Sequence, residues 1–135
     1  MSTATFEGFA AGVARDAEAT LARFIRLAAL NGTHGREAIR ALDAVLRAAP
    51  RADPGTLAAS LAWLRETDLR TEAAQLPMPA VAIHGEADSV TSPAAGRWLA
   101  AHIPEARFVG ISGCAHAPFV THAAQFVAAI ESLDG

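Results

Sequence analysis

One acid and one histidine in the second half of the chain have the types and spacing of a proton-transfer pair. Asp88 and His116 each follow a short apolar segment, at 80–83 and 107–111 respectively. A carboxylate bound to one ring nitrogen of a histidine fixes the tautomer, which leaves the other nitrogen free to take a proton from a nucleophile. The two residues therefore predict a charge-oriented general base. A simpler alternative is that Asp88 caps a turn and His116 is a loop histidine.

The elements around the pair are predicted from the same stretch. The apolar run at 80–83 is typical of a buried strand and ends at His84-Gly85. Ser92-Pro93 then provides a helix N-cap and a first-turn proline, and the helix is expected to close near residue 103. A second strand is expected at 107–111. Strand–helix–strand order predicts parallel strands, whose carboxyl ends would bring Asp88 and His116 to one edge of the sheet.

The pattern H-G-x-x-D, a Ser-Pro helix start and then G-C-A-H-A-P-F resembles the last third of an α/β-hydrolase. Chain order in that fold is nucleophile, acid, histidine, so the resemblance implies that Asp88 and His116 are the second and third members of a catalytic triad. No serine lies in G-x-S-x-G. Ser112 comes nearest to that pattern but is too close to His116 to be a nucleophile elbow. The lone Cys114 is expected to be a small packed residue.

The first half of the chain is predicted to be helical. Apolar spacing indicates a short helix at 4–12, a helix at 16–30, a third from a Thr33 cap to about residue 49, and a fourth that begins at Pro54. A polar connection is expected at 66–75, and a last helix from Pro118. We therefore expect an α/β chain with two segments, a helical cap at 1–72 and a β-α-β-α part of a hydrolase core at 73–135.

Two strands make a poor sheet. Strands with two apolar faces require further strands and helices, so the sequence indicates a partial α/β-hydrolase fold without its N-terminal half. The exposed strand edge also predicts association, either with the missing half or with a second copy of the chain.

A narrower resemblance covers nearly the whole chain. The segments E-A-T-L-A-R-F (18–24), L-R-E-T-D-L-R (64–70), L-P-M-P (76–79) and A-H-A-P-F-V-T-H-A-A-Q-F (115–126) are similar to the pimeloyl-[acyl-carrier protein] methyl ester esterases of biotin synthesis. The resemblance implies a V-shaped cap whose arginines hold acyl carrier protein, here Arg23, Arg36 and Arg40. It also implies that Phe24 faces the acyl chain. Ala19 departs from the pattern at a further arginine position, for which Arg26 is a possible substitute.

The chemistry of the residues supports these binding roles independently of the resemblance, but each role also has a simpler structural alternative. Arg36 and Arg40 are one helical turn apart and project together, and guanidinium groups suit carboxylates and phosphates. A solvated helix face explains the same pattern. For Phe24 the simpler reading is a core contact, and His84 is interpreted as structural. The remaining histidines lack a second ligand at a plausible spacing, so we predict no metal site and no cofactor.

Composition excludes several classes of protein. The net charge is −3, which argues against a nucleic-acid partner, although nine of the eleven arginines precede residue 73. No stretch is apolar enough to span a bilayer, the N-terminus does not resemble a signal peptide, and there is one cysteine. The cytoplasm is the expected location.

Together these features predict part of a serine carboxylesterase that hydrolyses acyl methyl esters, with acyl carrier protein or a small ester as its partner. We expect the chain alone to be inactive because it lacks the nucleophile and the oxyanion hole, and this leaves its status as an enzyme open. The alternative is a non-catalytic module that binds an acyl carrier or a lipid-like partner, in which Asp88 and His116 have no catalytic role.

Overall fold

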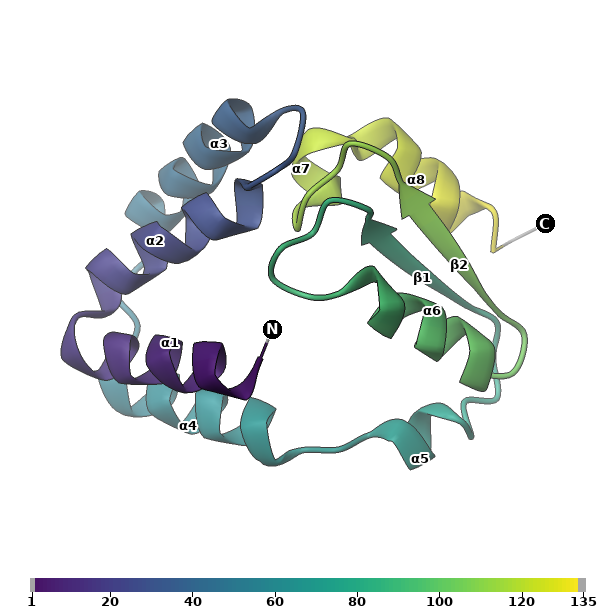
Figure 1. Cartoon of the computed structure of the whole chain (residues 1–135), viewed down its shortest axis with the longest axis horizontal. Coiled ribbons are helices and arrows are strands. Elements are labelled where there is room, and N and C mark those ends of the chain that lie inside the picture. The colour runs from purple at the N-terminus through teal and green to yellow at the C-terminus, as the bar shows by residue number, and fades with distance from the viewer. Residues whose placement is uncertain (1, 134–135) are drawn as a thin grey trace.

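A computed structural model describes residues 2–133 of the chain (Figure 1). Helices dominate the first half and a two-stranded sheet with its helices forms the second. In chain order the elements are α1 (Thr3–Arg15), α2 (Ala17–Ala29), α3 (Gly35–Ala48), α4 (Pro54–Glu66), α5 (Arg70–Ala73), β1 (Ala80–Gly85), α6 (Pro93–His102), β2 (Ala106–Ile111), α7 (Pro118–Thr121) and α8 (Ala123–Glu131).

Side-chain caps explain where several helices begin. Asp16 ends α1 through its backbone N–H and caps α2 by accepting a hydrogen bond from the N–H of Ala19 at 3.0 Å. Asp53 caps α4 in the same way, and Pro54 occupies its first turn. The first helix is longer than the predicted 4–12, and the predicted connection at 66–75 contains the helical turn α5.

The expected cap of the third helix is wrong. His34, not Thr33, is the N-cap residue of α3. Thr33 lies one residue earlier and binds the core instead: its N–H and Oγ1 both donate to the carbonyl of Gly113, at 2.8 and 3.2 Å. The Thr33 hydroxyl, which a helix cap would have used locally, is therefore bonded to Gly113, 80 residues away in sequence.

Helices α1 to α4 form two arms in Figure 1. One arm is the pair α2 and α3, and the other is the pair α1 and α4; α1 also contacts α2 near the short turn at Asp16. From α4 the chain runs through α5 to the start of β1. This arrangement places one end of the α2–α3 arm beside α7 and the loop after β2.

The sheet consists of β1 and β2 among the described residues. The strands are parallel, as predicted, and pair in register from Ala80 with Ala106 to Gly85 with Ile111. Helix α6 contacts both strands and α8 contacts β1. Burial on both faces of the strands, which the apolar run predicted, is not seen: Ala80 to His84 are only partly buried.

The buried core lies where the α2–α3 arm meets the loop after β2. Ala28 and Ala29 at the end of α2, Ala38 of α3 and Cys114 and Ala115 of the loop are each no more than 6% exposed. The N–H of His116 donates to the carbonyl of Ala28 at 3.0 Å. The backbone of this loop is thus bonded directly to the helical segment.

The predicted last helix is divided at His122 into α7 and α8. Within residues 2–133, none of the helices has the length and apolar character needed to cross a membrane.

Candidate active site

Asp88 is held by a tight turn after β1. Its backbone N–H donates to the carbonyl of Gly85 at 3.2 Å. One carboxylate oxygen, Oδ1, accepts hydrogen bonds from the N–H groups of Val90 at 2.7 Å and Thr91 at 3.0 Å, while Oδ2 accepts one from Thr91 Oγ1 at 2.9 Å. The side chain is only 4% exposed. The turn therefore fixes the carboxylate before any histidine is considered.

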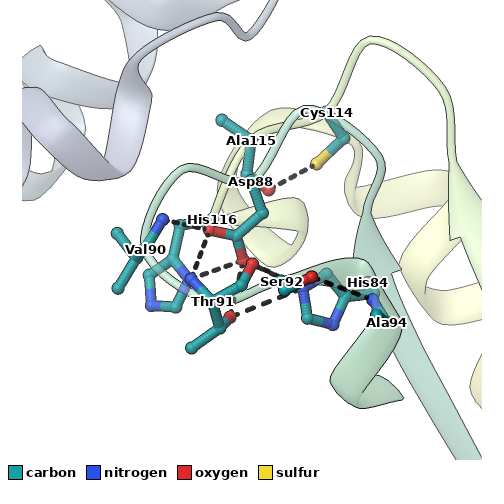
Figure 2. A network of polar contacts seen from close by, with 9 residues as sticks. All are labelled: His84, Asp88, Val90, Thr91, Ser92, Ala94, Cys114, Ala115 and His116. Carbon is teal, nitrogen blue, oxygen red and sulfur yellow. Dashed lines mark hydrogen bonds and ion pairs between the residues drawn. The ribbon is translucent and has the colours of Figure 1, made fainter. Parts of the chain in front are cut away.

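His116 completes the pair from the loop after β2. Its Nδ1 lies 2.9 Å from Asp88 Oδ2 (Figure 2). The histidine side chain is 33% exposed, and among the described residues its Nε2 forms no hydrogen bond. Because the carboxylate accepts at Nδ1, the proton belongs on Nδ1 and Nε2 carries the free lone pair. The two residues that the sequence singled out as catalytic thus lie together with one basic nitrogen available.

The environment of Asp88 keeps its carboxyl group ionised. Burial is the largest single influence and by itself raises the pKa. The hydrogen bonds from His116, from the two backbone N–H groups and from the Thr91 hydroxyl together outweigh burial, so the pKa of Asp88 lies below its usual value. An ionised Asp88 can stabilise a positive charge on His116.

The sequence did not predict the part that Thr91 and His84 play around this carboxylate. Thr91 follows Asp88 by three residues, which is the spacing of a local side-chain-to-backbone turn, and that signal was available. His84 Nε2 lies 3.2 Å from Asp88 Oδ2 and 3.1 Å from the carbonyl oxygen of Thr91. No feature of the sequence indicated the direction in which this ring would point.

Phe24 links the helical segment to the histidine. Its ring packs edge-on against the ring of His116, with 6.1 Å between centroids, and it also packs against the ring of Phe9, with 5.3 Å between centroids. Phe24 and Arg23 also line a cavity of about 210 Å³ between α1 and α2. The cavity is mainly apolar and is also lined by Thr5, Gly8, Phe9, Gly12, Arg15, Thr20 and Leu27. The Phe24 ring therefore forms part of the cavity wall and also packs against His116.

The predicted partner-binding arginines lie on the two helices of one arm. Arg23 is exposed on α2, while Arg36 and Arg40 are exposed one turn apart on α3. Within the described residues, no ion pair involves any of the three. Arg26 donates to the carbonyl of Ala22 on its own helix at 3.3 Å.

Other nucleophiles and ligands do not complete the site in the part of the chain that the structure describes. Cys114 is fully buried, as expected of a packed residue, and burial raises the pKa of its thiol. No hydroxyl group binds His116 Nε2 among residues 2–133. Those residues also contain no group of three side chains suited to hold a metal ion.

Solved structures share this fold over about half of their length. A bromoperoxidase from Bacillus anthracis matches 98% of the chain with a TM-score of 0.84 and 26% identity, and the match covers 49% of that protein. A hydrolase from Pseudomonas aeruginosa matches the whole chain with a TM-score of 0.77 and 28% identity, over 51% of its own length. An esterase from Exiguobacterium antarcticum gives a TM-score of 0.81 at 15% identity, which supports the fold alone. The chain therefore has a partial α/β-hydrolase fold.

Sequence comparison gives a narrower relationship. Pimeloyl-[acyl-carrier protein] methyl ester esterases from Aromatoleum aromaticum and Nitrosomonas europaea are 35% and 36% identical to the chain over 98% of its length. The alignments cover 53% of each relative, so the chain spans about half the length of the curated proteins it matches. A scan against models of protein families gives no match. The resemblance predicted from the sequence, to α/β-hydrolases and to this group of esterases, is confirmed.

Proposed function

We propose that the chain supplies the acid, the histidine and the cap of a serine carboxylesterase. The substrate is an acyl methyl ester carried by acyl carrier protein, in biotin synthesis. The observation that carries the proposal is the contact between Asp88 Oδ2 and His116 Nδ1 at 2.9 Å, with the ring packed against Phe24. Among residues 2–133, Nε2 of His116 forms no hydrogen bond. The names of the related esterases supply the substrate class.

The chemistry follows from the orientation of the imidazole. A serine hydroxyl would give its proton to His116 Nε2 while its oxygen bonds to the ester carbonyl carbon. The imidazolium, stabilised by the ionised Asp88, would then pass that proton to the departing methanol. Water would repeat the sequence on the acyl-enzyme. No G-x-S-x-G occurs in the sequence, so the proposal requires a serine and an oxyanion hole from outside these 135 residues.

Residues 1–72 act as the cap in this proposal, and residues 73–135 as part of the hydrolase core. The apolar cavity beside Phe24 would receive the acyl chain near His116. The exposed Arg23, Arg36 and Arg40 carry positive charge without an acidic partner among the described side chains, which suits an acidic carrier protein. The half-buried strands leave apolar surface for a further segment or a second copy of the chain to cover.

A chimera tests the proposal. The chain would replace the matching half of the Aromatoleum aromaticum esterase, and the rest of that protein then contributes the region that the alignment does not cover. We expect the chimera to hydrolyse a pimeloyl methyl ester, while the chain alone does not. Asp88→Asn and His116→Ala in the chimera should each reduce kcat by about 10³-fold or more, as expected for members of a triad.

Variants of the same chimera also separate the two functions considered. A folded chimera that binds the carrier-linked ester but does not cleave it would favour the non-catalytic binding module. Cleavage that survives His116→Ala would contradict the assignment of this histidine. Arg97→Ala serves as the matched control for folding. Arg97 packs over the ring of Phe108 and not against the acid–histidine pair, so its replacement should leave turnover unchanged.

A further inference from the structure

His84 lies between the sheet and the Asp88 turn, in a position that constrains its ring. A Cβ atom added at Gly96 of α6 would lie 3.0 Å from His84 Nδ1, so this nitrogen faces the backbone of the helix at close range. The side chain is 13% exposed. None of the hydrogen bonds within the described residues involves Nδ1.

The other ring nitrogen faces oxygen atoms. His84 Nε2 lies 3.1 Å from the carbonyl oxygen of Thr91 and 3.2 Å from Asp88 Oδ2 (Figure 2). A carbonyl oxygen and an ionised carboxylate can only accept hydrogen bonds, and the Thr91 hydroxyl, 3.4 Å from Nε2, donates its proton to Asp88 Oδ2. The proton of a neutral His84 therefore belongs on Nε2, and Nδ1 is the nitrogen without one.

This tautomer makes His84 a donor to the residue that fixes Asp88. The hydrogen bond from Nε2 goes to the carbonyl of Thr91, while the hydroxyl and the N–H of Thr91 go to the two oxygens of Asp88. Because Asp88 Oδ2 is also the acceptor for His116, a shift of Thr91 would move the acceptor away from His116 Nδ1.

We propose that His84 is a positioning residue of the site: through its Nε2–H it holds Thr91, and beside it Oδ2 of Asp88, in the geometry that receives the Nδ1–H of His116. This inference rests on the proposed function, because the acid–histidine pair that His84 supports has a catalytic role only in that function. It differs from a packing role, in which any side chain that fills the space beside Gly96 would serve equally well.

The spacing in sequence explains how one strand end can do this. His84 is the second-last residue of β1, and Asp88 follows four residues later across a turn whose backbone hydrogen bond returns to Gly85. The strand fixes the histidine, the turn brings the carboxylate back to it, and Thr91 forms hydrogen bonds with both residues.

The test measures the tautomers of the two histidines by 15N NMR on the full 135-residue chain, at a pH where both imidazoles are neutral. In the unmodified chain we expect His84 in the Nε2–H form and His116 in the Nδ1–H form. His84 found in the Nδ1–H form would overturn the proposal, and this measurement needs no variant that has to fold.

A matched pair of variants then separates support from packing. His84→Gln and His84→Met have similar length and both lose the ring, but only glutamine retains an N–H donor that can reach Thr91. We expect His84→Met to lose the Nδ1–H signal of His116 and His84→Gln to retain most of it. Equal retention in both variants would show that packing alone suffices.

Asp88→Asn distinguishes failure of this inference from failure of the proposed function. If Asp88→Asn leaves the tautomer of His116 unchanged, the acid–histidine pair itself is wrong, and the inference is overturned with it. If Asp88→Asn alters the tautomer but His84→Met does not, the pair stands and only the role of His84 is overturned.

Discussion

Asp88 is the residue around which the site is built, since four hydrogen-bond donors are directed at its carboxylate. Two backbone N–H groups bind Oδ1, and the Thr91 hydroxyl and the His116 ring bind Oδ2. With four donors in place, the carboxylate needs no reorganisation when a positive charge appears on His116, which is the condition for electrostatic stabilisation of that charge.

The lowered pKa of Asp88 predicts how stability depends on pH. A carboxyl group whose folded-state pKa lies below its unfolded value stabilises the fold above the unfolded pKa, and that contribution is lost as the pH falls through the folded value. Asp88→Asn should therefore cost about 1.5–3 kcal/mol near pH 7, the range for hydrogen bonds to a charged group. The difference from the unmodified chain should shrink as the pH falls below about 4. Urea unfolding at pH 7, 5 and 3 measures this.

Asp68→Asn is the control for that experiment. Arg70 holds the pKa of Asp68 at about 2, but the Asp68 side chain is 55% exposed, so solvent screens the pair. We expect little change in stability from this variant at any of the three pH values. An equal loss of stability from both variants would show that the buried hydrogen bonds of Asp88 stabilise the fold no more than an exposed ion pair does.

At this scale the sequence predicted the acid and the histidine but not their supports. Asp88 and His116 could be found because strand ends and chain order place them at one edge. The contact between Thr91 and Asp88 could have been inferred from their spacing of three residues. The contact between His84 and Thr91, which are seven residues apart, depends on the path of the turn and on which ring nitrogen faces it, and no spacing in the sequence encodes either.

At the scale of elements, the end of β1 crosses the loop after β2 at close range. A Cβ atom at Gly85 would lie 2.0 Å from the carbonyl oxygen of Ala115 and 2.4 Å from that of Cys114. Backbone atoms cannot yield as a flexible side chain can, so only glycine fits here. This crossing brings the Asp88 turn and the His116 loop into contact.

Gly85→Ala should therefore separate the two parts of the site. We expect a loss of about 4 kcal/mol or more, in the range that marks a severe steric conflict, together with loss of the Nδ1–H signal of His116. Gly8→Ala on α1 is the matched control, because no atom of the described residues lies within 4 Å of a Cβ there. This variant should stabilise the helix by about 0.5–1 kcal/mol. If the urea midpoint of the Gly85→Ala variant were unchanged, the close approach of β1 to the loop after β2 would be contradicted.

The elements themselves were largely predictable and their connections less so. The helices at 16–30 and from Pro54 follow from apolar spacing, a cap and a first-turn proline, all of which are local signals. The Thr33 cap was wrong because its hydroxyl binds Gly113, a contact that arises only after the helical arm has packed on the loop.

At the scale of the whole molecule, the arginines are concentrated in the helical half. Nine of eleven precede residue 73, whereas the chain as a whole has a net charge of −3. Arg36 and Arg40 are exposed on the same arm that contacts the His116 loop. This surface would let an acidic partner approach the site from the side of α3.

Replacing Arg36 and Arg40 together with alanine tests that route. In the chimera described above, we expect KM for a carrier-bound ester to rise by about three- to tenfold, less so at high salt, with kcat nearly unchanged. The free methyl ester should show no change, because the acid–histidine pair is untouched. Equal losses on both substrates would mean that the arginines stabilise the helical arm, and no loss on either would leave them as a solvated face.

The bond from the N–H of His116 to the carbonyl of Ala28 has a consequence for engineering and for divergence. Here the last turn of α2 anchors the backbone of the histidine itself, and Thr33 anchors the same loop at Gly113. An exchange of the helical segment that discards residues 28–33 would therefore also remove the bonds that hold the loop of His116. Recombination that keeps these six residues with the core, and changes only the helices on either side, should leave the contact between His116 and Asp88 in place.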